Sequence, residues 1–266
     1  SMIALAAMVA LPVPAVAAIG AAIVLGHNLL DPLQPSDFGD FALLWQFLHE
    51  GGPILVGRQP IGVFAYPVLP WIGVMFLGFG AGRAFLLEGD KRRLLLIAAG
   101  AAMLAAFLLI RSLNAFGDPD PWAARGDFAR SAMAFMNVEK YPPSLLYLLA
   151  TLGVALMLTP LLERLPRALA NVLLTYGRVP LFAYVAHIYL AHGLMLLTLI
   201  AMGRDPSLGF NLLIKVFTAP QLFAGWGFGL PGVYAFWAAT LALLYPLCRW
   251  FGEVKRRRRD WWLSYL

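Results

Sequence analysis

Long apolar blocks separated by polar segments dominate the chain. Six of these blocks are long enough to cross the hydrocarbon core of a bilayer as helices, and the segments between them are rich in Gly, Pro and charged residues. We therefore predict an all-α fold, a polytopic transmembrane helix bundle with about six spans plus a partial N-terminal helix. The predicted spans are 13–30, 61–87, 94–113, 143–162, 180–202 and 231–251.

Shorter apolar pieces predict helices that do not cross the membrane. Met2 to Leu11 is too short to span, and we interpret it as the end of a helix that begins upstream. Phe41 to His49 is typical of a short surface helix, Phe128 to Asn137 of an interfacial helix, and Pro166 to Gly177 of a half helix at the surface. We predict one domain over 1–266, with a basic tail at 252–266.

Composition supports a membrane protein, because 61% of the residues are hydrophobic and only 13% are charged. No segment alternates with period two often enough to suggest an outer-membrane barrel. The single cysteine, Cys248, excludes an intramolecular disulfide framework. We expect it to be a small packed residue.

The net charge of +6 is distributed as membrane topology requires. Segments 88–93, 163–167 and 249–260 hold eleven basic residues against five acids, whereas the remaining polar segments hold six against nine. Six alternating spans place the first group on one side, which the positive-inside rule identifies as cytoplasmic. The C-terminus is then cytoplasmic, and its basic run contacts anionic lipid rather than nucleic acid.

The segment 177–192, GRVPLFAYVAHIYLAH, carries ionisable groups inside a predicted span. Pro180 suits the first turn of a helix, so Arg178 lies at its mouth and His187 about two turns inside. Ionisable groups at this depth are costly and are usually functional. His187 and His192 are roughly 140° apart around a helix, which argues against a shared metal site. For His192, a packing role through a hydrogen bond to a neighbouring helix stays equally open.

The outer ends of the predicted helices gather polar and aromatic residues beside Gly and Pro turns, which suggests a polar acceptor site that faces outward. Interfacial aromatic belts and solvated loop charges are the alternative explanation. Arg111 lies within a span and needs a buried partner, for which Asp118 and Asp31 are candidates. The predicted substrate-binding residues are Asn28, Tyr66, Trp71, Arg111, Asn114, Asp118, Trp122, Lys140, Tyr141 and Ser144.

At the inner side, Arg178 precedes the positive end of the helix that begins at Pro180, a place that suits phosphate or another anion. The alternative is one more basic residue that sets the topology. If both sites exist, His187 and His192 lie between them, and histidine is the natural group for passing a proton near neutral pH.

Five sequence blocks resemble one known family. Together they resemble bacterial members of the heparan-alpha-glucosaminide N-acetyltransferase-like family, in whose order they occur. The resemblance implies a multi-pass acyltransferase of the bacterial inner membrane, which moves acetyl groups from cytoplasmic acetyl-CoA to a sugar amine or hydroxyl on the far side. The blocks are GHNLLD at 26–31, YPVLPWIGVMFLGFGAG at 66–82, RSLNAFGDPDPW at 111–122, KYPPSLLYLLATLG at 140–153 and GRVPLFAYVAHIYLAH at 177–192.

The family normally begins with an Arg-Gly-containing helix and a histidine motif thought to carry catalysis, and neither occurs here. We expect the principal histidine of the family upstream of Ser1. Within the chain, we expect His27 to orient the acceptor or assist its deprotonation, with Asp31 four residues on fixing the tautomer of the imidazole. The other predicted roles are catalytic for His187, and binding of acetyl-CoA for Arg178, Tyr184 and His192.

Two other function classes compete with the acyltransferase. A small-molecule transporter or flippase also places His and Arg groups within the membrane, although no internal repeat relates the two halves of the sequence. A structural membrane subunit predicts no ligand. The identity of the acceptor and the formation of a homo-oligomer stay open.

Overall fold

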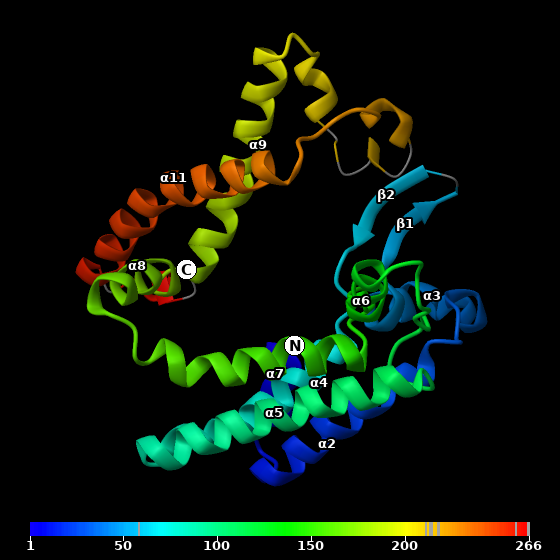
Figure 1. Cartoon of the computed structure of the whole chain (residues 1–266), viewed down its shortest axis with the longest axis vertical. Coiled ribbons are helices and arrows are strands. Elements are labelled where there is room, and N and C mark those ends of the chain that lie inside the picture. Colours follow the sequence, from blue (N-terminus) through cyan, green and yellow to red (C-terminus); the bar gives the residue numbers. More distant parts are fainter. Residues whose placement is uncertain (58, 211, 213–214, 217–218, 259, 265–266) are drawn as a thin grey trace. The chain divides into compact units, whose positions relative to one another are not determined.

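The computed structural model describes residues 1–266 except 58, 211, 213–214, 217–218, 259 and 265–266, so Arg58 and Arg259 of the charge count lie outside the described residues. Helices dominate it (Figure 1). Among the described residues, six helical segments are long and apolar enough to cross a membrane, which confirms the all-α, multi-pass prediction. They are Val13–Leu30, Leu69–Leu86, Gly89–Leu113, Leu145–Leu162, Pro180–Ala201 and Leu230–Arg257.

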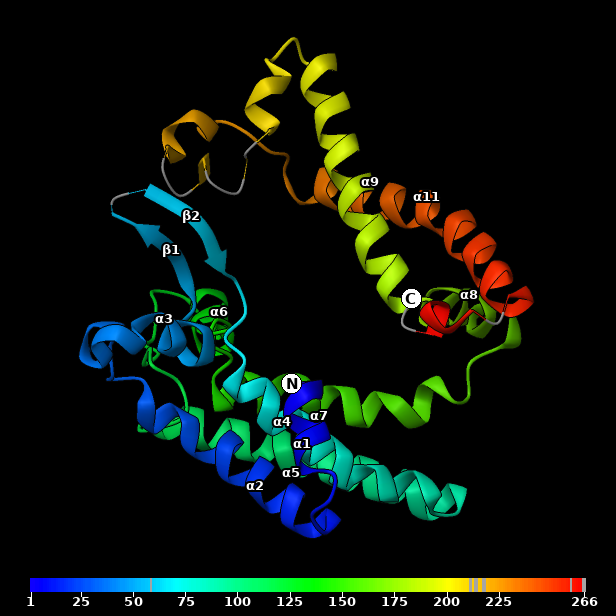
Figure 2. The same ribbon diagram turned by 180° about the vertical axis from the view of Figure 1, so that it is seen from behind.

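The chain divides into two compact units, Ser1–Arg164 and Leu165–Leu266, and each is described by itself. Helix α2 of the first unit continues as the 3-10 turn His27–Leu30, and α4 continues as Gly82–Leu86. Figure 2 shows α2, α4, α5 and α7 from behind. The helices of this unit are α1 (Met2–Met8), α2 (Val13–Gly26), α3 (Ala42–Trp45), α4 (Leu69–Ala81), α5 (Gly89–Leu113), α6 (Phe128–Met136) and α7 (Leu145–Leu162).

Glycines set the close packing of α2 on α4 and of α5 on α7. A Cβ added to Gly20 of α2 would lie 2.8 Å from the carbonyl oxygen of Gly73, and one added to Gly100 of α5 would lie 2.6 Å from that of Gly153. Small residues at such contacts let the backbones of membrane helices approach each other. Gly78 of α4 has no neighbour of this kind within 4 Å among the described residues.

The predicted second span begins too early. Its first residues belong to an antiparallel hairpin of β1 (Gly52–Val56) and β2 (Gln59–Phe64), and the helix starts only at Leu69. Ile61 and Val63 are β-branched and flank a glycine, a pattern that favours an extended strand over a helix. The exposed side chains of these two residues lie outside the helical core.

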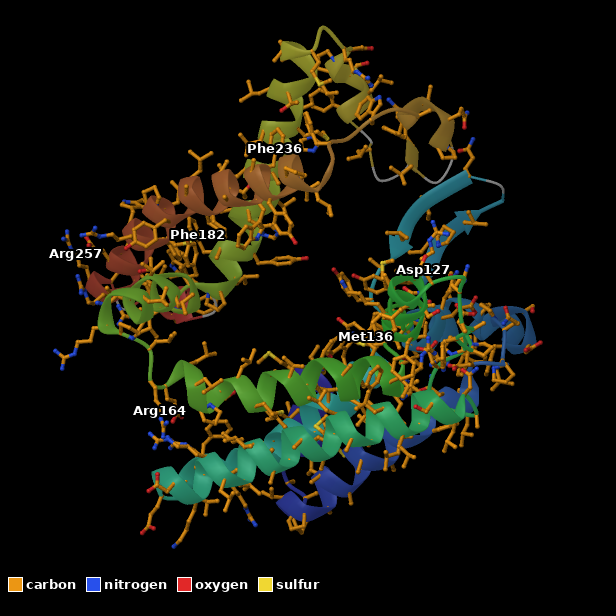
Figure 3. All side chains as sticks on the ribbon, viewed as in Figure 1. Asp127, Met136, Arg164, Phe182, Phe236 and Arg257 are labelled. Carbon is orange, nitrogen blue, oxygen red and sulfur yellow. The ribbon has the colours of Figure 1, made fainter. Side chains whose placement is uncertain are left out.

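The short helices agree with the predictions within a few residues. Asp127 caps α6 by accepting a hydrogen bond from the backbone N–H of Arg130, and Asp127 and Met136 mark its two ends in Figure 3. The predicted surface helix before the hairpin is α3 followed by the π-helical turn Gln46–Glu50. This turn buries His49, although the sequence suggested a surface position.

The second unit contains α8 (Arg167–Gly177), α9 (Pro180–Ala201) and α11 (Leu230–Arg257). Helix α8 is the predicted half helix, and the hydroxyl of Tyr176 in it donates to the carbonyl oxygen of Leu241 in α11. Cys248 is fully buried with Phe251, as a packed residue. Because α11 runs to Arg257 (Figure 3), the first part of the predicted tail is helical. The 3-10 turns of this unit are Pro206–Gly209, Pro220–Phe223 and Trp261–Ser264.

Candidate functional site

Arg111 lies in the last turn of α5 with only 2% of its surface exposed. Its guanidinium lies 3.6 Å from the carboxylate of Asp118, and the side chain of Asp118 is buried as well. Of the two candidate partners that the sequence offered for Arg111, Asp118 is therefore the one in contact, and Asp31 is not. The guanidinium donates to four carbonyl oxygens, those of Phe135 at 3.0 Å, Asp120 at 2.8 Å, Ala134 at 3.2 Å and Asn137 at 2.6 Å.

Asp118 joins the end of α5 to the start of α7. Its second carboxylate oxygen accepts hydrogen bonds from the hydroxyl of Ser144 and from the backbone N–H of Glu139, both at 2.8 Å. Ser144 in turn caps α7 by accepting from the backbone N–H of Tyr147. The polar groups of Arg111, Asp118 and Ser144 thus bind protein groups, and their contacts explain the folding of this region.

Three further residues of the predicted substrate set are also engaged within the protein. The amide group of Asn114 exchanges two hydrogen bonds with the backbone of Trp122, and the indole N–H of Trp122 donates to the carbonyl oxygen of Arg111. Trp71 packs against the buried cluster of Val24, Leu145 and Leu148. Asn114 and Trp122 therefore stabilise the loop after α5, and Trp71 is part of the core.

His27 is buried at the end of α2, with both ring nitrogens facing backbone carbonyl oxygens. Nδ1 lies 3.1 Å from the carbonyl oxygen of Val24 and 3.2 Å from that of Ile23, and Nε2 lies 2.9 Å from that of Pro143. The expected contact of its ring with Asp31 does not form. The helix tightens into a 3-10 turn at His27, where residues four apart are roughly 120° apart around the axis instead of sharing a face.

Asp31 instead contacts His49, a residue that sequence reasoning missed. Oδ1 of Asp31 lies 3.1 Å from Nε2 of His49, and Oδ2 accepts a hydrogen bond of 2.8 Å from the amide of Asn28. The rings of His49 and His27 are 6.2 Å apart. No sequence signal distinguished His49, because the apolar run FALLWQFL directly before it is itself largely exposed in the structure.

Burial and charge make this pair a distinct polar centre. The side chain of His49 is 3% exposed, and its Nδ1 has no hydrogen-bond partner among the described residues. Burial raises the pKa of the neighbouring Glu50 carboxyl, which the electrostatic effect of His49 partly offsets. Asn28 ties the centre to α7, because its side-chain oxygen accepts from the backbone N–H of Leu145 at 2.9 Å.

Three residues of the predicted substrate set form an exposed group. The ammonium of Lys140 lies 4.9 Å from the ring centre of Tyr141, whose ring meets that of Tyr66 edge-on at 5.4 Å. A hydrogen bond with Lys140 holds the pKa of the Tyr141 phenol below its usual range, and Tyr66 adds to this effect. An exposed group of aromatic rings, hydroxyls and a cation suits a polar ligand such as a sugar.

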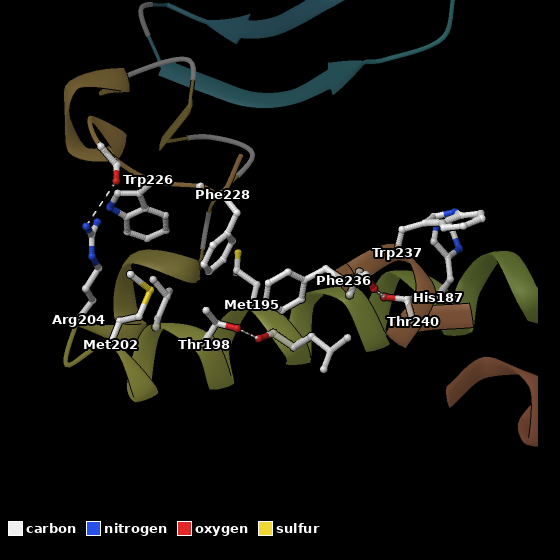
Figure 4. A pocket seen from close by; sticks show the side chains of 15 residues that line it. His187, Met195, Thr198, Met202, Arg204, Trp226, Phe228, Phe236, Trp237 and Thr240 are labelled. Atoms are coloured by element: carbon white, nitrogen blue, oxygen red, sulfur yellow. Dashed lines mark hydrogen bonds between the residues drawn. The ribbon is translucent and has the colours of Figure 1, made fainter. Parts of the chain in front are cut away.

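In the second unit, His187 lines an apolar cavity of about 450 Å³ between α9 and α11 (Figure 4). Arg204 lies at the other end of the cavity in this view, beside Trp226. His192 is not part of this lining, and its ring lies 6.3 Å from that of Phe210. His187 therefore borders an apolar cavity that His192 does not share.

A second cavity of about 590 Å³ lies between α11 and the end of α8 and is basic. Arg178 lines it, whereas the first residues of α9, at whose positive end the sequence predicted an anion, do not. Tyr184 and His192, the other residues predicted to bind acetyl-CoA, do not line it. The cationic lining residues are Arg178, Arg249, Lys255 and Arg256, against the single acid Glu253.

The fold and the apolar helices define the class of the protein, a multi-pass helical membrane protein. Comparison with known proteins yields no match, whether to a family model, to a curated protein or to a solved structure.

Proposed function

We propose that the chain is an integral membrane acyltransferase, which moves an acetyl group from cytoplasmic acetyl-CoA to an amine or hydroxyl of a sugar on the extracytoplasmic side. The observation that carries the proposal is the basic cavity around Arg178. Its volume lies within the usual range of small-molecule sites, roughly 300–1,000 Å³. Four cations against one carboxylate favour a ligand with several negative charges, such as the phosphates of CoA.

Charge distribution supports the placement of this cavity on the cytoplasmic side. Arg249, Lys255 and Arg256 belong to the basic C-terminal segment that the positive-inside rule assigns to the cytoplasm. Their side chains contribute to the same cavity as Arg178 at the start of α9. The inner membrane of a bacterium and a cytoplasmic C-terminus are parts of this proposal.

The exposed group of Lys140, Tyr141 and Tyr66 supports an acceptor site in the first unit. The acceptor nitrogen or oxygen attacks the thioester carbonyl carbon, the carbon–sulfur bond breaks, and CoA leaves as a thiol after taking up the proton that the acceptor releases. Stacking rings and hydroxyls near a cation suit the faces and hydroxyls of a sugar ring.

Binding of acetyl-CoA to the purified chain in detergent tests the proposal. In the Arg178→Gln variant we expect the Kd to rise about tenfold to a hundredfold, since hydrogen bonds to charged groups contribute roughly 1.5–3 kcal/mol. Arg167→Gln is the matched control, because Arg167 lies in the first turn of the same helix α8 and does not line the cavity.

Equal affinity in wild type and the Arg178→Gln variant contradicts the site. Transfer of label from radioactive acetyl-CoA to an amino sugar then tests the reaction itself. Accumulation of an amino sugar in proteoliposomes without any acetylated product contradicts the acyltransferase and identifies a transporter.

A further inference from the structure

His49 is the imidazole of the buried centre that keeps one ring nitrogen without a partner. A carboxylate accepts hydrogen bonds and does not donate them, so the 3.1 Å contact with Asp31 places the hydrogen on Nε2 of His49. A neutral imidazole then carries its lone pair on Nδ1. No described residue bonds this atom, although the side chain is 3% exposed. A buried polar atom in this state costs roughly 1–3 kcal/mol and calls for an explanation.

His27 provides the contrast within the same centre. Each of its nitrogens faces a backbone carbonyl oxygen, at 2.9 Å for Nε2 and at 3.1 Å for the shorter Nδ1 contact. A neutral imidazole donates only one hydrogen, and the other nitrogen of His27 faces an acceptor rather than a donor. His27 therefore links the end of α2 to Pro143, and it offers no nitrogen to a ligand.

We propose that Nδ1 of His49 accepts the proton of the acyl acceptor, and that Asp31 and Asn28 are positioning residues for this imidazole. The inference rests on the proposed function. The acceptor nitrogen forms a bond to the thioester carbonyl carbon, the carbon–sulfur bond breaks, and sulfur leaves as the CoA thiolate. The acceptor proton passes to Nδ1, while Asp31 stabilises the transient imidazolium; the imidazolium then returns this proton to water, and the thiolate takes up a proton from water to give the CoA thiol.

The chain connects this centre to the exposed acceptor group. Tyr141 is two residues from Pro143, whose carbonyl oxygen contacts His27 beside His49. Tyr66 is two residues from Val68, whose backbone N–H donates to the carbonyl oxygen of Phe47 in the same π-helical turn as His49.

The ionisable groups around His49 set the charge that it experiences. They are Asp31 on Nε2, the partly buried carboxyl of Glu50 next in sequence, and the ring of His27 at 6.2 Å. Asp31 is the group in direct contact, so it stabilises the protonated ring that the transfer step requires.

The test compares two acceptors in membranes that hold the full chain, with acetyl-CoA as donor and the uncatalysed rate subtracted. Both amines release one N–H proton on acetylation, but hydroxylamine is the less basic and more reactive nucleophile, so its attack depends less than that of glucosamine on a base that takes up this proton. In His49→Gln we expect kcat with glucosamine to fall about 10²- to 10⁴-fold, the usual contribution of a positioned base, and kcat with hydroxylamine to fall far less. Asp31→Asn should show the same selectivity with a smaller loss.

Equal losses with both acceptors indicate a structural role and overturn the proposal, as does full activity of His49→Gln. Wild-type membranes that transfer acetyl to neither acceptor refute the proposed function as well, so the two failures are distinguishable. Nitrogen-15 NMR of the histidine-labelled chain gives a readout that needs no transfer, since only four histidines occur and single variants assign them. A hydrogen on Nδ1 of His49 overturns the proposal.

Discussion

Two arginines beside apolar helices have opposite surroundings in the two units. Arg111 of the first unit is 2% exposed and donates to four carbonyl oxygens next to Asp118. Arg178 of the second unit is exposed and lines the basic cavity, and its side chain forms no hydrogen bond or ion pair with a described residue. Because protein acceptors occupy the guanidinium of Arg111, this residue stabilises the fold. The guanidinium of Arg178 has no protein acceptor among the described residues and remains available to bind a ligand.

The largest effect that follows from this comparison is on stability. Arg111→Met removes the guanidinium, which leaves Asp118 without its cationic partner and four carbonyl oxygens without this donor in a buried region. Breaking a buried ion pair costs about 3 to 5 kcal/mol, so we expect little folded protein and a strongly lowered Tm in detergent. Arg178→Met is the matched control and should leave the Tm nearly unchanged. Equal Tm values for the two variants contradict the comparison.

An intermediate effect on stability is expected from removing one hydroxyl in each unit, that of Ser144 or that of Thr198. Ser144 caps α7 and donates to Asp118, whereas Thr198 of α9 bonds the carbonyl oxygen of Leu194 in its own helix. Loss of a cap costs about 1 kcal/mol, so Ser144→Ala should lower the free energy of unfolding by at least this amount. Thr198→Ala should change it by less. If Thr198→Ala lowers the free energy of unfolding by more than Ser144→Ala does, the proposed difference between the two hydroxyls is wrong.

The smallest effect distinguishes the exposed group from the buried centre of the same unit. Lys140→Met removes the ammonium that lowers the pKa of the Tyr141 phenol. The pKa should rise toward the ordinary value for tyrosine, so that less tyrosinate forms at a given alkaline pH. Absorption of tyrosinate during a pH titration measures this change, with Tyr141→Phe as the assignment control. An unchanged titration refutes the contact between the two side chains.

Within the candidate site, sequence reasoning identified residues more reliably than their partners. It recognised that Arg111 requires a buried carboxylate, because the cost of an unpaired charge within a span is a local property. It paired Asp31 with His27 on the assumption of a regular α-helix. The 3-10 turn at His27 changes the spacing, and the carboxylate binds His49 instead, 18 residues further along the chain.

The sequence alone determined the number and approximate position of the membrane helices. The length and hydropathy of a span depend on consecutive residues, so five of the six predicted spans begin within about five residues of the helices observed. The exception begins at Ile61, where the β-branched residues and the glycine of the hairpin also form an apolar run. Hydropathy does not separate such a run from the helix that follows it.

Only the tertiary structure decided which polar groups meet and which stay free. Hydrogen-bond partners of a buried group come from segments that are distant in sequence, as Pro143 does for His27 and Asn137 for Arg111. Such pairings depend on distances of about 3 Å, which shift with a single change of helix type. The free nitrogen of His49 and the open surroundings of Arg178 are therefore properties of the folded chain.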